Sequence, residues 1–138
     1  MGRILAIDYG TKRVGIAVTD SLRIIASGLT TLHSKDVISF LENYIKTEKV
    51  DIIVVGEPKT LSNQKSDSAR FIDPFVTHLK KKFPQISIER FDERFTSLIA
   101  QQTIIASGLS KKDRRNKETV DLVSATIILQ DYLTYHKI

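Results

Sequence analysis

The hydrophobic positions of the chain follow two patterns, one typical of strands and one typical of helices. Residues 3–7 and 51–56 are almost unbroken apolar runs of strand length, which indicates strands buried on both faces of a sheet. Residues 37–45 instead carry apolar side chains three and four positions apart, which predicts a helix with one buried face. Together the two patterns predict an α/β fold in which helices cover a mixed sheet.

The expected elements follow from these patterns and from the polar and turn residues between them. We expect strands at residues 3–8, 13–19, 24–32, 51–56 and 86–91, and helices at residues 34–47, 66–82, 96–106 and 117–135. The first three strands form an antiparallel start, with a turn at Asp20-Ser21, and Ser34 is the expected N-cap of the first helix. Pro74 leaves two alternatives for the second helix, a kink or a new start at Asp73.

Asp8 stands at the end of the first apolar run and is followed by Tyr9 and Gly10. A strand buried on both faces would hold this carboxylate rigidly at the rim of the sheet. The alternative is a turn residue, because Asp-x-Gly is frequent in hairpins, where Asp bonds its own backbone and Gly accepts positive φ. The segment itself does not separate these interpretations, so the decision depends on other acids.

The length and composition limit the class of protein. The 138 residues are enough for one domain, residues 1–138, whose core needs no disulfide. The absence of cysteine excludes disulfides and thiolate metal sites and agrees with a reducing cytoplasm. No apolar run approaches the ~20 residues of a membrane span, and the start lacks the apolar region of a signal peptide. We therefore expect a cytoplasmic protein without a membrane partner.

The net charge of +5 is concentrated in one short stretch, residues 110–117. That stretch contains several cations and a single acid, Asp113, and the rest of the chain is close to neutral. The cations are Lys111, Lys112, Arg114, Arg115 and Lys117. A local basic patch is typical of a protein that binds nucleic acid. The alternative is a solvated loop that promotes solubility, and charge alone favours that alternative.

Three acids fall where such a sheet would bring acids together. Asp8 ends the first strand, Glu93 ends the last strand, and Asp121 heads the small and apolar face of the last helix. Hard Mg²⁺ or Mn²⁺ sites are built from a few carboxylates and substrate phosphate, so the joint occurrence favours a metal site for phosphodiester cleavage. Asp92 and Glu57 are further candidate ligands, although for Glu57 we favour a role in the loop that follows.

Each acid also has a purely structural explanation. Asp121 would interact favourably with a helix N-terminus, worth ~0.3–1 kcal/mol. Asp92 and Glu93 would form an acidic lead-in to a helix, paired with Arg90 or Arg94. Other chemistries have less support, because the histidines show no ligand spacing and the chain lacks a nucleophile elbow and a Walker A motif.

Four segments of the chain, taken in order, resemble motifs of a known family. They are residues 8–20, which begin Asp8-Tyr9-Gly10-Thr11-Lys12-Arg13, then Val54-Val55-Gly56-Glu57-Pro58, Asp92-Glu93-Arg94-Phe95-Thr96-Ser97, and residues 121–133. The chain resembles the YqgF family, which comprises bacterial Holliday-junction-resolvase-like proteins also described as pre-16S ribosomal RNA nucleases. The resemblance covers essentially the whole chain. It implies a ribonuclease H-like fold. The predicted elements follow one another along the chain in the order βββαβαβαα, and their five strands would form one mixed sheet.

The resemblance also implies a site and an activity. It implies that Asp8, Glu93 and Asp121 are the catalytic acids that bind Mg²⁺ (or Mn²⁺), the same set that their positions suggest. The implied activity is metal-dependent cleavage of structured nucleic acid, in maturing the 5′ end of small-subunit ribosomal RNA on ribosomal precursor particles. Phosphate contacts would come from Lys12, Arg13, Arg94, Lys111, Lys112, Arg114, Arg115 and Lys117.

Several alternatives stay open at the level of sequence. A second hypothesis keeps the fold and changes the substrate to branched DNA, for which resolvases act as symmetric dimers because a junction has two related strands. The protein itself would be a monomer or a homodimer. A non-catalytic RNA-binding assembly module would keep the acids for structural reasons. The strand–turn–strand start also occurs in actin-like ATPases, but those need two such lobes. In the wider ribonuclease H-like group the second acid often comes from the fourth strand, so the choice between Glu57 and Glu93 also stays open.

Overall fold

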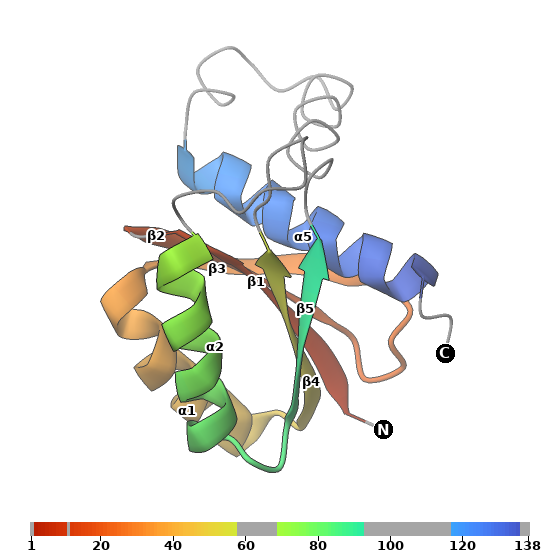
Figure 1. The fold of residues 1–138 in the computed structure, drawn as a ribbon. Coiled ribbons are helices and arrows are strands. Elements are labelled where there is room, and N and C mark those ends of the chain that lie inside the picture. Colours follow the sequence, from red (N-terminus) through yellow and green to blue (C-terminus); the bar gives the residue numbers. More distant parts are fainter. Residues whose placement is uncertain (1, 11, 58–68, 93–116, 136–138) are drawn as a thin grey trace.

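The computed structural model describes residues 2–10, 12–57, 69–92 and 117–135. The elements are, in chain order, β1 (Arg3–Tyr9), β2 (Arg13–Thr19), β3 (Ala26–His33), the 3₁₀ turn η1 (Ser34–Asp36), α1 (Val37–Thr47), β4 (Val50–Glu57), α2 (Ala69–Lys82), β5 (Ser87–Asp92) and α5 (Lys117–Tyr135) (Figure 1). The predicted order of strands and helices is confirmed for these residues. The helix predicted at residues 96–106 lies outside them.

The sheet has five strands in the order β3-β2-β1-β4-β5. β1 pairs antiparallel with β2, and β2 with β3, whereas β1, β4 and β5 are parallel neighbours. Because parallel strands end on the same side, the carboxyl ends of β1, β4 and β5 meet at one edge, here called the C-terminal edge (Figure 1). The edge where the same three strands begin is called the N-terminal edge.

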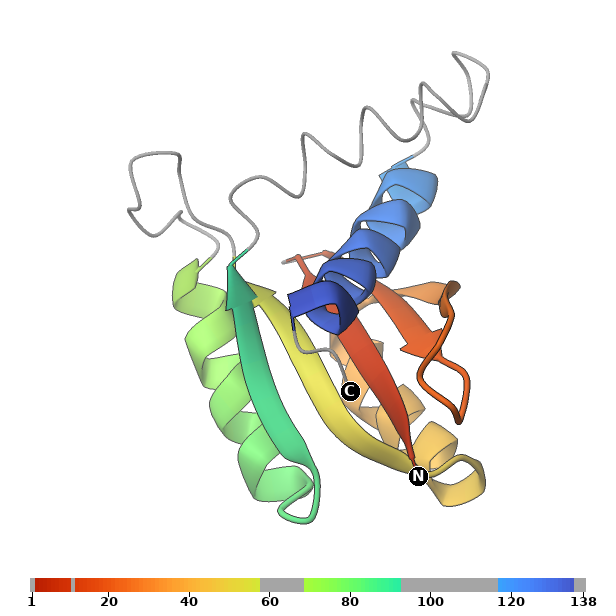
Figure 2. The ribbon, with the colours of Figure 1, turned by 90° about the vertical axis from the view of Figure 1, so that its right-hand side faces the viewer.

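Helices cover both faces of the sheet, which explains why β1 is apolar at successive positions. Leu5 and Ile7 contact the hydrophobic cluster under α1 and α2, whereas Ile4 and Ala6 contact the cluster under α5. These four side chains have no exposed surface. Figure 2 shows α1 and α2 on one side of the strands and α5 on the other. The predicted burial of the first strand on both faces is therefore confirmed.

The third strand begins later than predicted, at Ala26 instead of residue 24. The Asp20 carboxylate accepts hydrogen bonds from the backbone N–H groups of Ile24 and Ile25, at 2.8 and 2.9 Å, which extends the turn. Arg23 lies within this turn in the left-handed region, with φ of 59°. Its guanidinium donates to the Asp51 carboxylate at 2.8 Å, a contact that local sequence does not reveal.

The first helix starts at a different residue from the one predicted, and the second helix decides between the two alternatives at Pro74. Ser34 is not the N-cap of the first helix, because residues 34–36 form a 3₁₀ turn before α1. The ring of His33 caps that turn by accepting from the backbone N–H of Lys35 at 3.2 Å. Pro74 lies inside α2, so this helix does not start anew at Asp73. Within the described ranges, no helix combines the length and hydropathy that a membrane crossing requires.

A hydrogen bond between Tyr132 and Glu89 joins α5 to β5. The Tyr132 hydroxyl donates to the Glu89 carboxylate at 2.7 Å, and the ring is almost fully buried. Burial, followed by this hydrogen bond, raises the pKa of Tyr132 above its ordinary value. The neutral phenol is therefore favoured in the folded protein.

We expect Tyr132→Phe to lower the free energy of unfolding by about 1–2 kcal/mol at pH 8, since it removes a hydrogen bond to a charged acceptor. The raised pKa adds a pH dependence. The unfolded chain loses its tyrosine proton near pH ~10 while the folded protein keeps it, so wild-type stability falls as the pH rises above that value. The variant should lose stability less steeply. Urea unfolding at pH 8 and pH 10.5 measures both effects, and identical pH slopes would contradict the assignment.

Candidate functional site

The end of β1 holds Asp8 at the C-terminal edge, on the side covered by α5. Asp8 is half-buried and pairs with Gly15 of β2. It stands two residues after Ala6, which packs under α5, and side chains alternate along a strand. The neighbouring Tyr9 points to the opposite side, where its ring stacks on Phe75 of α2 with centroids 4.3 Å apart. The stacked ring and the paired strand together hold the backbone at Asp8 in place.

The hairpin after Asp8 needs glycine at one position and brings cations to the same edge. A Cβ atom on Gly10 would lie 2.6 Å from the backbone oxygen of Arg13, so only glycine fits this turn. Lys12 is exposed in the turn, and Arg13 is half-buried at the start of β2. The backbone N–H of Ser34 donates to the Lys12 carbonyl at 3.2 Å, which brings η1 and its exposed Lys35 beside the turn.

Glycine occupies the positions beside Asp8 on both neighbouring strands. Gly15 of β2 pairs directly with Asp8. On the other side, the pairing of Ile7 with Val55 puts Gly56 of β4 in the row of Asp8. Neither neighbour has a side chain, so neither of them fills the space beside the carboxylate on the α5 side of the sheet. A glycine inside a strand often marks the close approach of a ligand. This feature was missed from the sequence because it depends on register.

The α5 helix presents its small and apolar face to the sheet, as predicted. Ala125, Ile128 and Leu129 are fully buried, and Ser124 and Tyr132 nearly so. Asp121 stands at the beginning of this face, one turn before Ser124 and Ala125, and the structure describes it by its backbone position alone. In Figure 1 α5 crosses the sheet near the C-terminal edge, and its beginning (light blue) lies on the side of β2.

The other predicted ligands are only partly described. Glu57 and Asp92 are the last residues of β4 and β5 and pair with each other in the parallel register. Glu93 lies outside the described residues, as do Arg94, Lys111, Lys112, Arg114 and Arg115, and Lys117 is the first residue of α5. Among the described residues, no group of three or more acidic or histidine side chains is placed to hold a metal ion.

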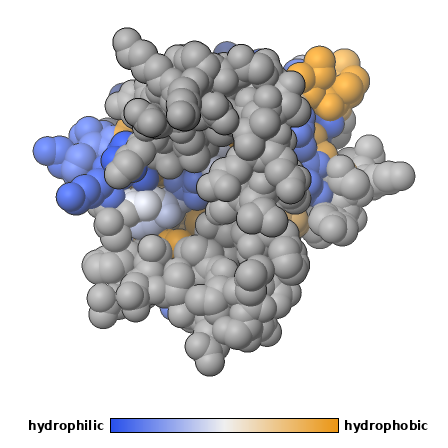
Figure 3. All heavy atoms as spheres, turned by 90° about the horizontal axis from the view of Figure 1, so that it is seen from above, coloured by the Kyte–Doolittle hydropathy of each residue, from blue (hydrophilic) through white to orange (hydrophobic). Residues whose placement is uncertain are grey.

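Arg90 and the histidines were also given structural roles from the sequence. Arg90 forms an ion pair with Asp73 of α2, at 2.7 Å. The alternative in which Asp92 and Glu93 pair with Arg90 or Arg94 depends on side chains outside the described residues and stays a prediction. His33 and His78 are exposed at element ends or surfaces, as predicted, and His136 lies outside the described residues. Figure 3 looks onto the C-terminal edge and shows hydrophilic described residues (blue) gathered at its left side.

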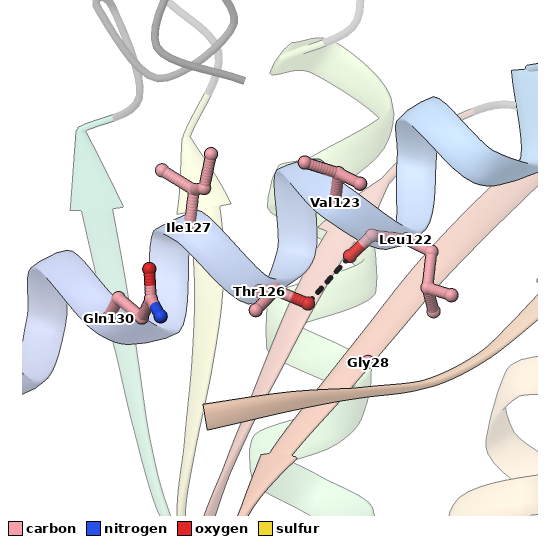
Figure 4. A pocket seen from close by; sticks show the side chains of 6 residues that line it. All are labelled: Gly28, Leu122, Val123, Thr126, Ile127 and Gln130. Atoms are coloured by element: carbon pink, nitrogen blue, oxygen red, sulfur yellow. Dashed lines mark hydrogen bonds between the residues drawn. The ribbon is translucent and has the colours of Figure 1, made fainter. Parts of the chain in front are cut away.

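An apolar hollow of about 360 Å³ lies between α5 and β3 (Figure 4). It is lined by Gly28, Leu122, Val123, Thr126, Ile127 and Gln130. Leu122 closes tightly over Gly28, where a Cβ atom would approach it to 2.7 Å. The lining contains no titratable group, so this hollow offers no acid–base or metal chemistry.

Comparison with known proteins was made for sequence and for structure. Residues 2–135 match the model of the RuvX family, described as Holliday junction resolvase. A protein of Flavobacterium psychrophilum named "Putative pre-16S rRNA nuclease" is 58% identical over 134 residues, covering 97% of this chain and 98% of its own length. A protein of the same name from Bacteroides fragilis is 53% identical over 133 residues, covering 96% of each chain.

Solved structures show the same fold at low sequence identity. The fowlpox virus Holliday junction resolvase superposes with a TM-score of 0.60 at 12% identity, covering 96% of this chain and 99% of that one. RuvC of T. thermophilus, solved in complex with a Holliday junction substrate, gives a TM-score of 0.58 at 13% identity, with 99% and 96% covered. The fold is therefore ribonuclease H-like, as the sequence resemblance implied.

Proposed function

The chain belongs to the RuvX family, also called YqgF, and on this premise we propose that it is a metal-dependent endonuclease that processes the 5′ end of precursor 16S ribosomal RNA. The observation that supports the proposal best is the row Gly15–Asp8–Gly56 at the C-terminal edge. It combines a carboxylate at the end of a buried strand with neighbours that have no side chains. The choice of substrate is supported by the name shared by relatives that are 58% and 53% identical.

The residues at this edge fit a hard divalent cation. Asp8, Glu93 and Asp121 are the proposed ligands, and oxygen donors of this kind suit Mg²⁺ or Mn²⁺. The flanking glycines have no side chains that would compete with an ion or a substrate phosphate for the space beside Asp8. When bound, the metal would supply charge that activates water and stabilises the leaving oxygen.

The protein's own cations would position the nucleic acid. Lys12 is exposed at the turn after Asp8, and Arg13 begins the returning strand, so both lie next to the acid on the chain. Their charges would hold a phosphate of the substrate beside the carboxylate. We assign Lys35, next to the same turn, to a further phosphate contact. The remaining proposed contacts are Arg94, Lys111, Lys112, Arg114, Arg115 and Lys117.

The position of Glu57 argues against its being the second ligand. Glu57 stands two residues after Val55, which belongs to the cluster under α1 and α2. Asp8 stands two residues after Ala6, which belongs to the cluster under α5, so the two positions belong to opposite faces of the sheet. Asp92 pairs with Glu57 in the parallel register, so the same argument applies to its position. Glu93, which the resemblance to the family implies as a ligand, lies outside the described residues. We assign the second ligand to Glu93.

We therefore expect Glu93→Gln to reduce cleavage of precursor RNA at least tenfold and Glu57→Gln to change it less than about threefold, a difference of about 0.7 kcal/mol or more in activation free energy. Initial rates at saturating Mg²⁺ measure both variants, each an isosteric carboxylate-to-amide change. The reverse order of the two effects would assign the second ligand to Glu57.

A second candidate substrate is branched DNA, because the matched family is described as Holliday junction resolvase. A junction has two related strands, and a resolvase for it would act as a homodimer, whereas the RNA nuclease would act as a monomer or a homodimer. Cleavage of precursor 16S RNA and of a four-way junction, with Mg²⁺ and with chelator, separates the two substrates. Sedimentation at the same concentration gives the oligomeric state.

The proposed function also predicts where the protein works. A nuclease for precursor ribosomal RNA would act in the cytoplasm on ribosomal precursor particles. If RNA binds with the same affinity with and without Mg²⁺, and neither substrate is cut, the protein is instead a non-catalytic RNA-binding assembly module. That result would reject the nuclease proposal.

A further inference from the structure

A second group of cations lies at the N-terminal edge, remote from the proposed site. It consists of Lys46, Lys49, Lys80 and Lys81, here called the lysine patch, all of them exposed. Lys46 is in the last turn of α1, Lys49 lies between α1 and β4, and Lys80 and Lys81 are in the last turn of α2. Both helices end at the edge where β4 and β5 begin (Figure 2).

One ion pair joins the C-terminal parts of these two helices. The Lys82 ammonium contacts the Glu42 carboxylate at 3.2 Å, which joins α2 to α1. Lys46 lies one helical turn after Glu42 on the same face of α1. Lys46 and Lys49 both line a polar hollow of about 410 Å³ that also includes Gln85, from the turn after α2. Lys81 lines a separate hollow with Thr77 and His78 on α2. The lysine patch is therefore a row of cations along the N-terminal edge, with Lys46 and Lys49 in one hollow and Lys80 and Lys81 at the end of α2.

The acids near the lysine patch are already paired with other cations. Besides Glu42 with Lys82, the Glu48 carboxylate contacts Arg3 at 3.3 Å. The Asp51 carboxylate contacts Arg23 at 2.8 Å and also accepts from the backbone N–H of Gly2. Within the described part of the chain, the four lysines of the patch form no ion pair. All four ammonium groups are therefore available to an external anion, although the charge of Lys49 also helps to lower the pKa of Asp51.

Lysines near the ends of helices also have a structural explanation. Cations in the last turn of a helix interact favourably with its dipole, worth about 0.3–1 kcal/mol. This accounts for Lys46, Lys80 and Lys81 separately, but Lys49 lies beyond the end of α1. It also does not explain why the local acids are all paired elsewhere.

We infer that the lysine patch binds the phosphate backbone of the same nucleic-acid substrate, at a segment away from the cut site. The inference rests on the proposed function, which supplies a long RNA as the polyanion. β4 has eight residues, so the two edges are about 25 Å apart. That distance exceeds the Debye length of about 8–10 Å at physiological salt. The patch therefore acts only through direct contact, and only on substrates long enough to span both edges.

The test compares two quadruple variants with the wild type. One replaces the patch with glutamine (K46Q/K49Q/K80Q/K81Q), and the matched control keeps the charge with arginine (K46R/K49R/K80R/K81R). Binding of long precursor RNA is measured between 50 and 300 mM salt. Each lost phosphate contact lowers the slope of log affinity against log salt by about 0.7–0.9. We expect the glutamine variant to lose about two to four such units and at least tenfold in affinity, and the arginine variant to retain both.

Cleavage of a short RNA that reaches only the C-terminal edge distinguishes the inference from the proposed function. Wild type and both variants should cut it at equal rates. Equal loss for short and long RNA, or an unchanged salt slope, would overturn the inference. Unchanged RNA affinity with weaker association with precursor particles would overturn it in favour of an acidic protein partner. If no protein cuts the short RNA while the slope still falls, the nuclease proposal fails and the patch remains an RNA-binding surface.

Discussion

Asp8→Asn is expected to reduce Mg²⁺-dependent cleavage of precursor RNA by about 10³-fold, which corresponds to about 4 kcal/mol of activation free energy. The change removes the negative charge and keeps the shape of the side chain. An amide binds a hard cation much less well than a carboxylate. The position of Asp8 is set by the pairing of β1 with β2 and β4, which the substitution does not change.

The same substitution should leave the fold intact. Asp8 is half-buried at the edge of the sheet, and the core residues beside it on β1 are unchanged. We expect a change of at most about 1 kcal/mol in the free energy of unfolding, as for a substitution outside the core. Urea unfolding measures this change, and calorimetric titration with Mg²⁺ in the presence of RNA measures loss of the metal site independently of turnover.

Asp51→Asn provides a matched control for the loss of activity. Asp51 is also an acid at a strand end, but it lies at the N-terminal edge and binds Gly2 and Arg23. The hydrogen bond from the backbone N–H of Gly2, more than the other contacts, lowers the pKa of this carboxyl. The folded protein therefore favours the charged carboxylate. We expect Asp51→Asn to affect stability and to leave the cleavage of a short RNA unchanged. Full activity of Asp8→Asn would remove Asp8 from the site.

The parts of the fold that the sequence predicted depend on local patterns. The apolar runs of β1 and β4 identify strands that turn out to be covered by helices on both faces. The helical spacing of Ala125, Ile128 and Leu129 identifies the face of α5 that meets the sheet. Such patterns are readable because the period of a strand or helix relates each position directly to one side.

The features that the sequence did not predict depend on register and on distant partners. Gly15 and Gly56 are ordinary glycines until the pairing of β2, β1 and β4 puts them on both sides of Asp8. The late start of β3 arises from the hydrogen bonds that Asp20 accepts, and the Arg23–Asp51 ion pair joins residues far apart in the chain. No local propensity encodes these contacts, because each requires the sheet to exist first.

The attachment of α5 to the sheet gives the largest expected effect on stability. Ile128 is fully buried in the cluster that also contains Ala6 of β1, Ala17 of β2 and Val54 of β4. Ile128→Ala removes buried carbon atoms and leaves a cavity that the sheet cannot close. We expect a loss of about 3 kcal/mol, within the range of 2–5 typical of such changes. That is a large fraction of the ~5–15 kcal/mol that stabilises a domain.

A graded series on α5 separates packing from other effects. Ile128→Val should cost only about 0.5–1.5 kcal/mol, and Gln130→Ala, at an exposed position of the same helix, less than about 0.5 kcal/mol. Urea unfolding of the three variants measures the series. Because α5 also carries Asp121, Ile128→Ala should lower cleavage at temperatures where the protein is still folded, through displacement of that acid. A loss of stability below 1 kcal/mol for Ile128→Ala would contradict the tight contact between α5 and the sheet.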